Sequence, residues 1–290
     1  MVKRIFLLLL VFAIAPASIA HTSILWEVSG NGLSQPSYVL GTLKFVNEKD
    51  FFIPGAITQA MDKVQIFAIE DQVDHHHQHE LNKAIHFSNG KDLHSVLSPA
   101  EYDKTASLFA TEFGISRKRF DTDYARMIPL ALSITMTRLS LKESLKYYDI
   151  ELLHIAHEHK LKSFSLEPIE REAEAIQQFP MDEQARALLH SVNTFERQKE
   201  EFRQLVQAFR AGDIDKVFEY SQHPTENNPR FTEAFFTQRN KEWLPKIDKM
   251  MHEAPALIAV GVSHLEGTSG LLQLLRDKGF TVKPVPVESR

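Results

Sequence analysis

The sequence predicts an α/β fold with a mixed, partly parallel sheet built from both ends of the chain and a large helical insertion between them. Three observations predict this fold. Strand-like apolar stretches occur near the N-terminus and again near the C-terminus, a strand–helix–strand unit lies within residues 38–70, and helical patterns fill most of residues 80–250. Because a strand–helix–strand crossover in one sheet places its two strands parallel, at least part of the sheet is expected to be parallel.

The N-terminal strands are predicted from β-rich segments that flank a polar turn. Residues 23–28 and 38–42 are rich in β-branched, aromatic and apolar residues, and the segment between them contains Gly30, Gly32 and Pro36. Glycine and proline in such a cluster are typical of a turn. A short helix over residues 54–63 and a continuous apolar strand over residues 64–70 follow, and they complete the strand–helix–strand unit.

The middle of the chain is predicted to be almost wholly helical. Ser98, Pro99 and Glu101 have the spacing of a capping box with proline at the first helical position, and Gly114 ends that helix. Asp149 is the expected N-cap of the helix predicted at residues 150–160. Further helices are predicted at residues 123–146, 150–160, 170–178, 182–211, 214–221 and 231–251.

The strand pattern resumes within and after the helical region. A short strand at residues 163–167 interrupts the helices, a buried strand is predicted at 255–261, and a final strand follows a helix at 268–279 that Gly279 ends. No linker rich in glycine, serine or proline separates these parts. Residues 21–290 are therefore interpreted as one α/β unit with a helical insertion at about 80–250.

The first twenty residues have the three-part pattern of a secretory signal peptide. Lys3 and Arg4 form a basic start, an apolar run of eleven residues follows, and Ser18 and Ala20 are small residues before the expected cleavage site. The run is short for a bilayer span of about 20 residues, and no later stretch is apolar enough. We therefore expect cleavage of residues 1–20, no stable membrane anchor afterwards, and a periplasmic or secreted protein.

Composition adds two constraints. The chain has 290 residues, 43% hydrophobic residues and no cysteine, so it can bury a sizeable core but cannot form disulfides. Loss of residues 1–20 takes the formal net charge from −5 to −7. This acidity argues against nucleic acid or an anionic membrane as a partner.

Polar side chains are predicted to meet where the parallel strands end. Ligands of open α/β sheets bind at the carboxyl ends of the strands, where side chains point into a crevice. Two carboxylates, an imidazole and an amine would make this edge a polar site. The strand ends present Gly41, Thr42, Lys44, Glu70, Glu167, Gly261, Ser263 and His264.

Five segments of the chain resemble the TraB/GumN family, which includes the pheromone-shutdown proteins and is similar to the Tiki metalloproteases. The segments are LWEVSGNGLSQPSYVLGT, ITQAMDKVQIFAIE, LLHIAHEHKLKSFSLEP, TQRNKEWLPKI and AVGVSHLEGTSGLLQLLRDKGFTVKPV. The family pattern has two GxxH motifs and a glutamate, which in the Tiki branch implies a peptidase that depends on a divalent metal. On this resemblance, Glu70 matches the glutamate, Gly261 and His264 match the second GxxH, and Arg239 and Asn240 match an "RN" pair.

The first GxxH falls on Gly41–Lys44, so that lysine replaces the histidine. A neutral imidazole nitrogen binds zinc, manganese or cobalt, whereas a protonated ammonium has no lone pair. Glu70 and His264 then remain as metal ligands, although a catalytic metal usually has about three protein ligands. We expect Lys44 to take the place of the cation and to form an ion pair with Glu70.

Two functions follow from the resemblance and from the lysine. The first is an exported hydrolase that acts on peptides or a related small substrate, with Glu70 or His264 as the base and Arg239 or Lys44 as an electrostatic clamp. The second is a non-catalytic protein that binds a peptide or small ligand. The residues select neither an oligomeric state nor a substrate. The expected substrate contacts are Gly41, Thr42, Glu167, Asn240, Gly261 and Ser263.

The run DHHHQH at residues 74–79 is a further candidate for metal binding. Histidine-rich tracts attract metals weakly, and on a helix only His75 and His79 would share a face. A solvated loop or helix start, a surface metal patch and a contribution to the main site are the alternatives that the sequence leaves open.

Overall fold

The computed structural model describes residues 23–71, 75–142 and 144–287, and it contains a six-stranded mixed sheet. The predicted signal peptide lies outside the described residues. Within them, no helix combines the length and the hydropathy needed to cross a bilayer. In spatial order, the strands are β6 (Lys162–Ser165), β4 (Ile66–Ile69), β7 (Ala256–Gly261), β2 (Ser37–Thr42), β1 (Leu25–Ser29) and β8 (Thr281–Val285).

The predicted sheet from both ends of the chain is confirmed. β6, β4, β7 and β2 are mutually parallel, whereas β1 runs antiparallel to both β2 and β8. In the register, Thr42 lies opposite Gly261, and Ile69 lies opposite Ser165 on one side and Ala259 on the other. The carboxyl ends of four parallel strands therefore share one edge of the sheet, as the sequence predicts.

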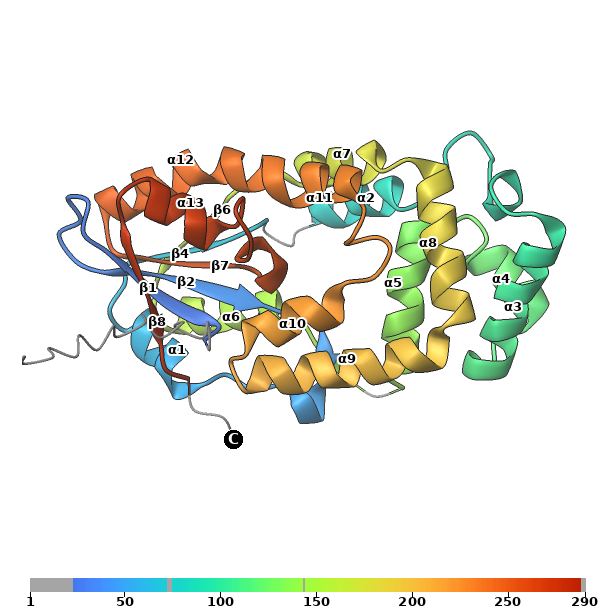
Figure 1. The fold of residues 1–290 in the computed structure, drawn as a ribbon, viewed down its shortest axis with the longest axis horizontal. Helices are drawn as coiled ribbons and strands as arrows, with labels where there is room; N and C mark the ends of the chain where they lie inside the picture. The colour runs from blue at the N-terminus through green and yellow to red at the C-terminus, as the bar shows by residue number, and fades with distance from the viewer. Residues whose placement is uncertain (1–22, 72–74, 143, 288–290) are drawn as a thin grey trace, which may run out of the picture.

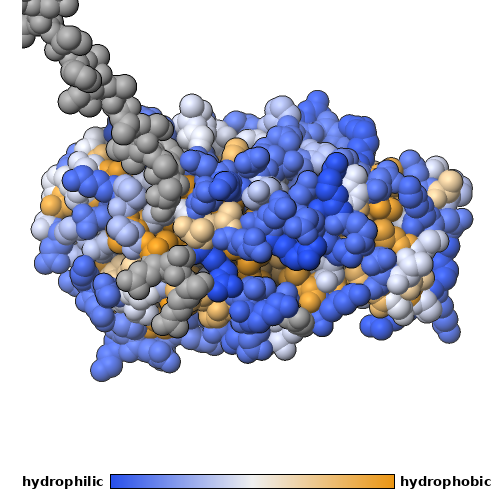
Figure 2. Space-filling model, turned by 60° about the horizontal axis from the view of Figure 1, so that its bottom comes forward, coloured by the Kyte–Doolittle hydropathy of each residue, from blue (hydrophilic) through white to orange (hydrophobic). Residues whose placement is uncertain are grey.

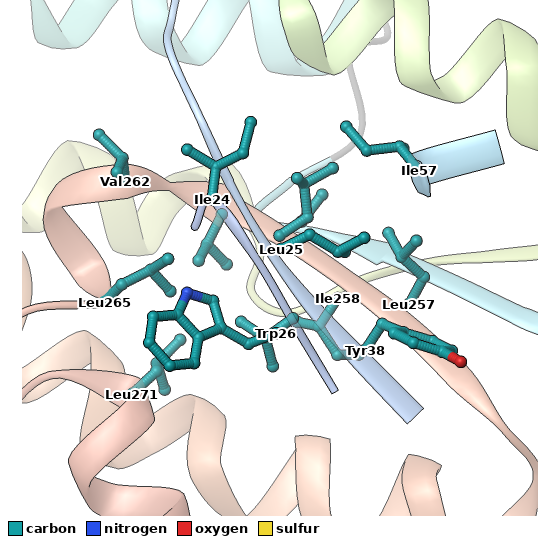
Figure 3. Close-up of a cluster of buried hydrophobic side chains, with 14 of the residues drawn as sticks. Ile24, Leu25, Trp26, Tyr38, Ile57, Leu257, Ile258, Val262, Leu265 and Leu271 are labelled. Carbon is teal, nitrogen blue, oxygen red and sulfur yellow. The ribbon is translucent and has the colours of Figure 1, made fainter. Parts of the chain in front are cut away.

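Helices cover both faces of the sheet (Figure 1). α12 (Gln238–Glu253) and α13 (Leu271–Asp277) lie on one face, and α1 (Gly55–Met61) and α6 (Tyr148–Glu158) lie on the other. Neighbouring residues of β1 point to opposite faces, so Trp26 packs beside Leu265 and Leu271 while Leu25 points toward Ile57 (Figure 3). This alternation builds one apolar core on each side of the sheet.

A second apolar cluster lies in the helical part of the molecule, at the right of Figure 1. Phe109, Phe120, Leu132 and Leu188 are fully buried in it. Not all of the insertion belongs to this cluster, because α6, α9 (Phe195–Arg210) and α10 (Ile214–Ser221) contribute to the core of the sheet. The second cluster is built mainly from α3 (Pro99–Phe113), α4 (Arg117–Asp123), α5 (Pro129–Ser140) and α8 (Met181–Asn193).

Two long predicted helices are each divided in the structure. The helix predicted at 123–146 is wrong: α4 ends at Asp123, α5 begins at Pro129, and Leu145–Lys146 forms the two-residue strand β5 with β3 (Val46–Asn47). Proline lacks an N–H and holds the preceding Ile128 in an extended conformation, so a new helix starts there. The helix predicted at 182–211 breaks at Thr194, which has φ −120° and ψ 22°.

Local capping signals give mixed outcomes. The capping box of α3 is confirmed, since Ser98 Oγ accepts from the Glu101 N–H and Glu101 accepts from the Ser98 N–H. Gly114 and Gly279 follow helices with φ of 66° and 92°, as expected for glycine. The N-cap predicted at Asp149 is wrong, because α6 begins after Tyr147 and Asp149 lies inside its first turn.

The surface in Figure 2 is mainly hydrophilic, with smaller hydrophobic areas divided among polar residues. Among the described residues, the large apolar side chains with exposed surfaces include Ile134, Phe164 and Phe218, which lie on different elements. Single exposed apolar side chains of this kind are ordinary for a folded domain.

We predict that Ser98→Ala lowers the free energy of unfolding by about 1 kcal/mol, because it removes the N-cap of α3. Urea denaturation of the purified protein measures this difference. Ser107→Ala is the matched control: Ser107 is exposed in the same helix, and alanine should be neutral or slightly stabilising there. Equal stability of the two variants would contradict the role of the capping box.

Candidate functional site

The guanidinium of Arg239 is the centre of a buried polar cluster at the carboxyl edge of the sheet. The side chain is 0% exposed. Its Nε donates to Glu167 Oε1 at 2.8 Å, its Nη2 donates to Glu70 Oε2 at 2.8 Å, and its Nη1 donates to the Phe235 carbonyl at 3.1 Å. Arg239 lies in the first turn of α12, so these bonds join that helix to the ends of β4 and β6.

The two carboxylates are held by further donors. Glu70 directly follows β4, and its Oε1 accepts the Gly261 N–H at 2.7 Å. A Cβ at position 261 would lie 3.3 Å from that oxygen, so glycine gives the carboxylate room to approach the backbone. Glu167 lies two residues beyond β6, is buried, and accepts from Trp243 Nε1 through its Oε2 at 2.7 Å.

Asn240 fixes the tautomer of His264. The Asn240 amide nitrogen donates to the carbonyls of His264 and Ser269 at 3.1 and 2.9 Å, which leaves Asn240 Oδ1 as an acceptor. His264 Nδ1, 2.7 Å from that oxygen, must therefore carry the proton. The lone pair of His264 Nε2 then faces Arg239 Nη1 at 3.3 Å.

Aromatic rings enclose this cluster. The ring centroids of Phe235 and Trp243 each lie 4.7 Å from the Arg239 guanidinium carbon, within the range of cation–π interaction. The His264 ring lies between Trp243 and Phe236, with centroid distances of 4.5 and 5.0 Å. These contacts keep water away from the buried charges and strengthen the hydrogen bonds among them.

A π turn, η3 (Glu233–Thr237), separates α11 (Pro229–Thr232) from α12, and sequence reasoning missed it. The Gln238 N–H bonds to the Glu233 carbonyl five residues back, as in a π helix. Arg239 Nη1 uses the Phe235 carbonyl within this turn. π turns are frequent at functional sites, but no residue pattern in this segment signals one.

The electrostatics define the charge states of the inner groups. Burial alone would raise the pKa of Glu70, but His264 in its protonated form, Arg239 and Lys44 outweigh burial and lower the pKa to about 2. Burial lowers the pKa of His264 to about 3. At neutral pH, Glu70 is ionised and His264 is neutral. Arg239 is therefore the cation that neutralises Glu70.

The Lys44–Glu70 ion pair expected from the sequence is wrong. Glu70 pairs with Arg239, which reaches it from α12 at 2.8 Å. Lys44 is exposed and interacts with Glu70 only as one of several neighbouring charges. Glu172 raises the pKa of Lys44 most strongly, and Asp149 also raises it.

Lys44 therefore belongs to an outer polar layer, which we define as Lys44, Asp71, Asp149 and Glu172 together with the exposed side of Glu70. Asp71, Asp149 and Glu172 are partly exposed. Burial, with Glu172, raises the pKa of Asp71 to about 8, and burial raises the pKa of Asp149 to about 6. Two of these positions had no signal in the sequence. Thr42 is close enough to Asp149 to lower its pKa, and Glu172 lies in the first turn of α7 (Ile169–Gln178).

The other predicted site residues have different surroundings. A Cβ on Gly41 would lie 2.9 Å from Leu265 Cδ1, so this glycine admits the segment after β7 rather than a ligand. Thr42 is buried, Gly261 is bonded to Glu70, and Asn240 orients His264. Ser263 lines a cavity, which also contacts Phe236 and Thr237.

The inner residues do not fit a catalytic divalent metal. Glu70 and His264 are the two candidate ligands, and His264 Nε2 and Glu70 Oε1 lie 3.9 Å apart. The Arg239 guanidinium contacts both residues, so a cation bound between them would face a fixed positive charge. Within the described part of the chain, no group of three or more His, Cys, Asp or Glu side chains is arranged to hold a metal ion.

The histidine run begins α2 (His75–Ala84), so a helix start is correct there. The side chains of His75, His76 and His77 lie outside the described part of the structure. His79 is exposed, and its Nε2 lies 3.8 Å from Glu80 Oε1. A role for the run in metal binding stays a prediction.

We predict that Arg239→Met lowers the free energy of unfolding by about 3–5 kcal/mol, because it leaves Glu70 and Glu167 as uncompensated buried charges. Thermal and urea denaturation measure the change. Lys241→Met in the same helix is the control, since Lys241 is exposed and should shift stability by less than about 0.5 kcal/mol. Adding Glu167→Gln to Arg239→Met should restore part of the loss, and additive effects of the two changes would contradict the buried pair.

Comparison with known proteins gives one positive result. A family model described as TraB/PrgY/gumN family matches residues 24–284. No curated protein and no solved structure matches the chain. The match covers nearly the whole chain and includes every strand end that forms the site. The chain belongs to the TraB/PrgY/gumN family.

Proposed function

We propose that this chain is an exported, non-catalytic member of its family that binds a peptide or a related small ligand. The observation that supports this function is the engagement of Arg239 with Glu70 and with His264. A metallopeptidase needs these two residues as metal ligands, but here one carboxylate oxygen is paired with a guanidinium and the imidazole lone pair faces the same group. The residue that would supply a third ligand is Lys44, which has no lone pair.

The outer polar layer supplies the groups for binding. Lys44 is an exposed donor that carries a positive charge, and it stands among the carboxyl groups of Asp71, Asp149 and Glu172. A ligand with both a cationic group and carbonyl or carboxylate oxygens complements such a surface. The end of a peptide chain, with its amine and its first carbonyl groups, has this chemistry. The inner layer then serves as a rigid base beneath the bound ligand.

A hydrolase without a metal is the second candidate, and the carboxyl groups of Asp71 and Asp149 favour it. Their pKa values of about 8 and about 6 bracket neutral pH. This range suits a pair of general acid and general base groups. The experiment that tests binding also tests this alternative, because cleavage of the peptide would be detected directly.

The first test is metal content together with peptide binding. After incubation with manganese, cobalt and zinc and then desalting, we expect elemental analysis to find well below one metal ion per chain. A set of short synthetic peptides of differing charge should bind without being cleaved, as followed by calorimetry and mass spectrometry. Asp149→Asn and Lys44→Met should weaken this binding by about tenfold, the equivalent of about 1.4 kcal/mol.

The control in this test is Asp277→Asn, a change of the same kind at an exposed position in α13. Stoichiometric metal in the unaltered protein that is lost on Glu70→Gln would refute the non-catalytic function, as would peptide cleavage that depends on Asp149. Circular dichroism of each variant shows whether its fold is retained.

Export is part of the proposal and has its own test. We expect the protein expressed with residues 1–20 to be recovered from the periplasm or medium, with His21 as its N-terminus by mass spectrometry. Leu9→Arg places a charge in the apolar run and should retain the uncleaved chain inside the cell. Leu9→Ile is the matched control and should be exported normally. Recovery of the intact N-terminus from the unaltered protein would contradict cleavage.

A further inference from the structure

A cavity of about 380 Å³ lies beside the Arg239 centre, where α10, α11, the π turn η3 and the segment after β7 meet. Its volume falls within the range of about 300–1,000 Å³ that is common for ligand sites. Its lining includes Phe218, Ser221, Glu226, Glu233, Phe236 and Ser263.

The lining has the chemistry of a site for an organic cation. Glu226 and Glu233 contribute carboxylates, Phe218 and Phe236 contribute aromatic rings, and hydroxyl and amide groups supply hydrogen-bond acceptors. The lining contains no lysine, arginine or histidine. Carboxylates and aromatic faces together attract ammonium and guanidinium groups, whereas an anionic ligand would meet no positive partner.

Glu226 provides an independent reason to expect a ligand. Its Oε2 is buried and has no hydrogen-bond partner among the described residues. A buried carboxyl oxygen without a partner is unfavourable, and a donor from a ligand would relieve this. Burial also raises the pKa of Glu226 to about 7, so a bound cation would stabilise its ionised form.

The cavity adjoins the site described above. Ser263 precedes His264 in the short helix η4 (Val262–His264) that follows β7, and the Phe236 ring packs against the His264 ring at 5.0 Å. Three of the five residues of the π turn, Glu233, Phe236 and Thr237, face the cavity. The π turn thus connects the cavity wall with the turn that carries Arg239.

We propose that this cavity binds the basic side chain of a peptide ligand, through the ammonium of a lysine or the guanidinium of an arginine. The inference rests on the proposed peptide-binding function and adds the side-chain specificity to it. The carboxylates of Glu226 and Glu233 pair with the cation, and Phe218 and Phe236 contact the aliphatic part of the side chain.

The test compares two amino-acid probes with both ends blocked, so that their backbones carry no charge. N-acetyl-lysine-N-methylamide has a side-chain ammonium group, and N-acetyl-norleucine-N-methylamide lacks it. Titration into the full mature chain, followed by calorimetry or protein NMR, gives their affinities. We expect the lysine probe to bind at least fivefold more tightly than the norleucine probe. The double variant Glu226→Gln with Glu233→Gln should abolish this preference, and Ser221→Phe, which fills the cavity, should weaken both probes.

Glu219→Gln is the matched control, because Glu219 is exposed on α10 and does not line the cavity. Equal affinity for the two probes, or a lysine preference that survives the double variant, would overturn the assignment of the cavity. Failure of the proposed function is a separate result. In that case, peptide affinity would not change in Asp149→Asn or Lys44→Met, whatever affinities the two probes have. Peptide binding that depends on Asp149 while the lysine probe fails to bind would leave the function standing and remove only the cavity.

Discussion

The burial of the Arg239 guanidinium is the constraint on which the rest of the site depends. A fully buried arginine requires partners for its charge and for its five N–H groups. Glu70 and Glu167 supply two carboxylates from neighbouring parallel strands, and the π turn supplies the Phe235 carbonyl. Each partner comes from a different element, so the ion cluster fixes α12 against the carboxyl ends of β4 and β6. The same ion pairs therefore determine both the packing of α12 and the charge state of the site.

The same cluster divides the strand-end residues into two layers with different capacities. In the inner layer, Glu70, Glu167 and His264 have partners that use most of their hydrogen-bonding groups. In the outer layer, Lys44 and the nearby carboxylates retain contact with solvent. A ligand that bound to the inner layer would have to break buried ion pairs. The cost in free energy would be comparable to that of removing one partner of a buried ion pair. We therefore propose that recognition uses the outer layer and the cavity beside the Arg239 centre.

The sequence predicts the frame of this site better than its connections. The strand ends at Glu70, Glu167 and His264 were predicted because parallel strands bring their carboxyl ends together regardless of the details of packing. The pairing of Glu70 was predicted wrongly, because the reach of Arg239 from α12 depends on the π turn, which has no local signal. Asp149 was interpreted as an N-cap from its position before a helical pattern, but helix starts are uncertain by a residue or two. The two helix breaks also differ in their sequence signals. Proline favours the first position of a helix, a preference at Pro129 that the helical periodicity obscured, whereas no residue preference at Thr194 indicated a break.

The lysine at position 44 changes the site by more than the loss of one metal ligand. The raised pKa values of Asp71 and Asp149 reflect burial first and then repulsion from Glu172 and Glu70 across the outer layer. Lys44 opposes it, since its charge lowers the pKa of Asp71, of Asp149 and of Glu70. A neutral histidine at this position would add a lone pair but remove that charge, and the carboxylates would then bind protons more tightly. The acidic outer layer and the lysine thus depend on each other, so a return to the family's histidine would not by itself recreate a metal centre while Arg239 still occupies the position between Glu70 and His264.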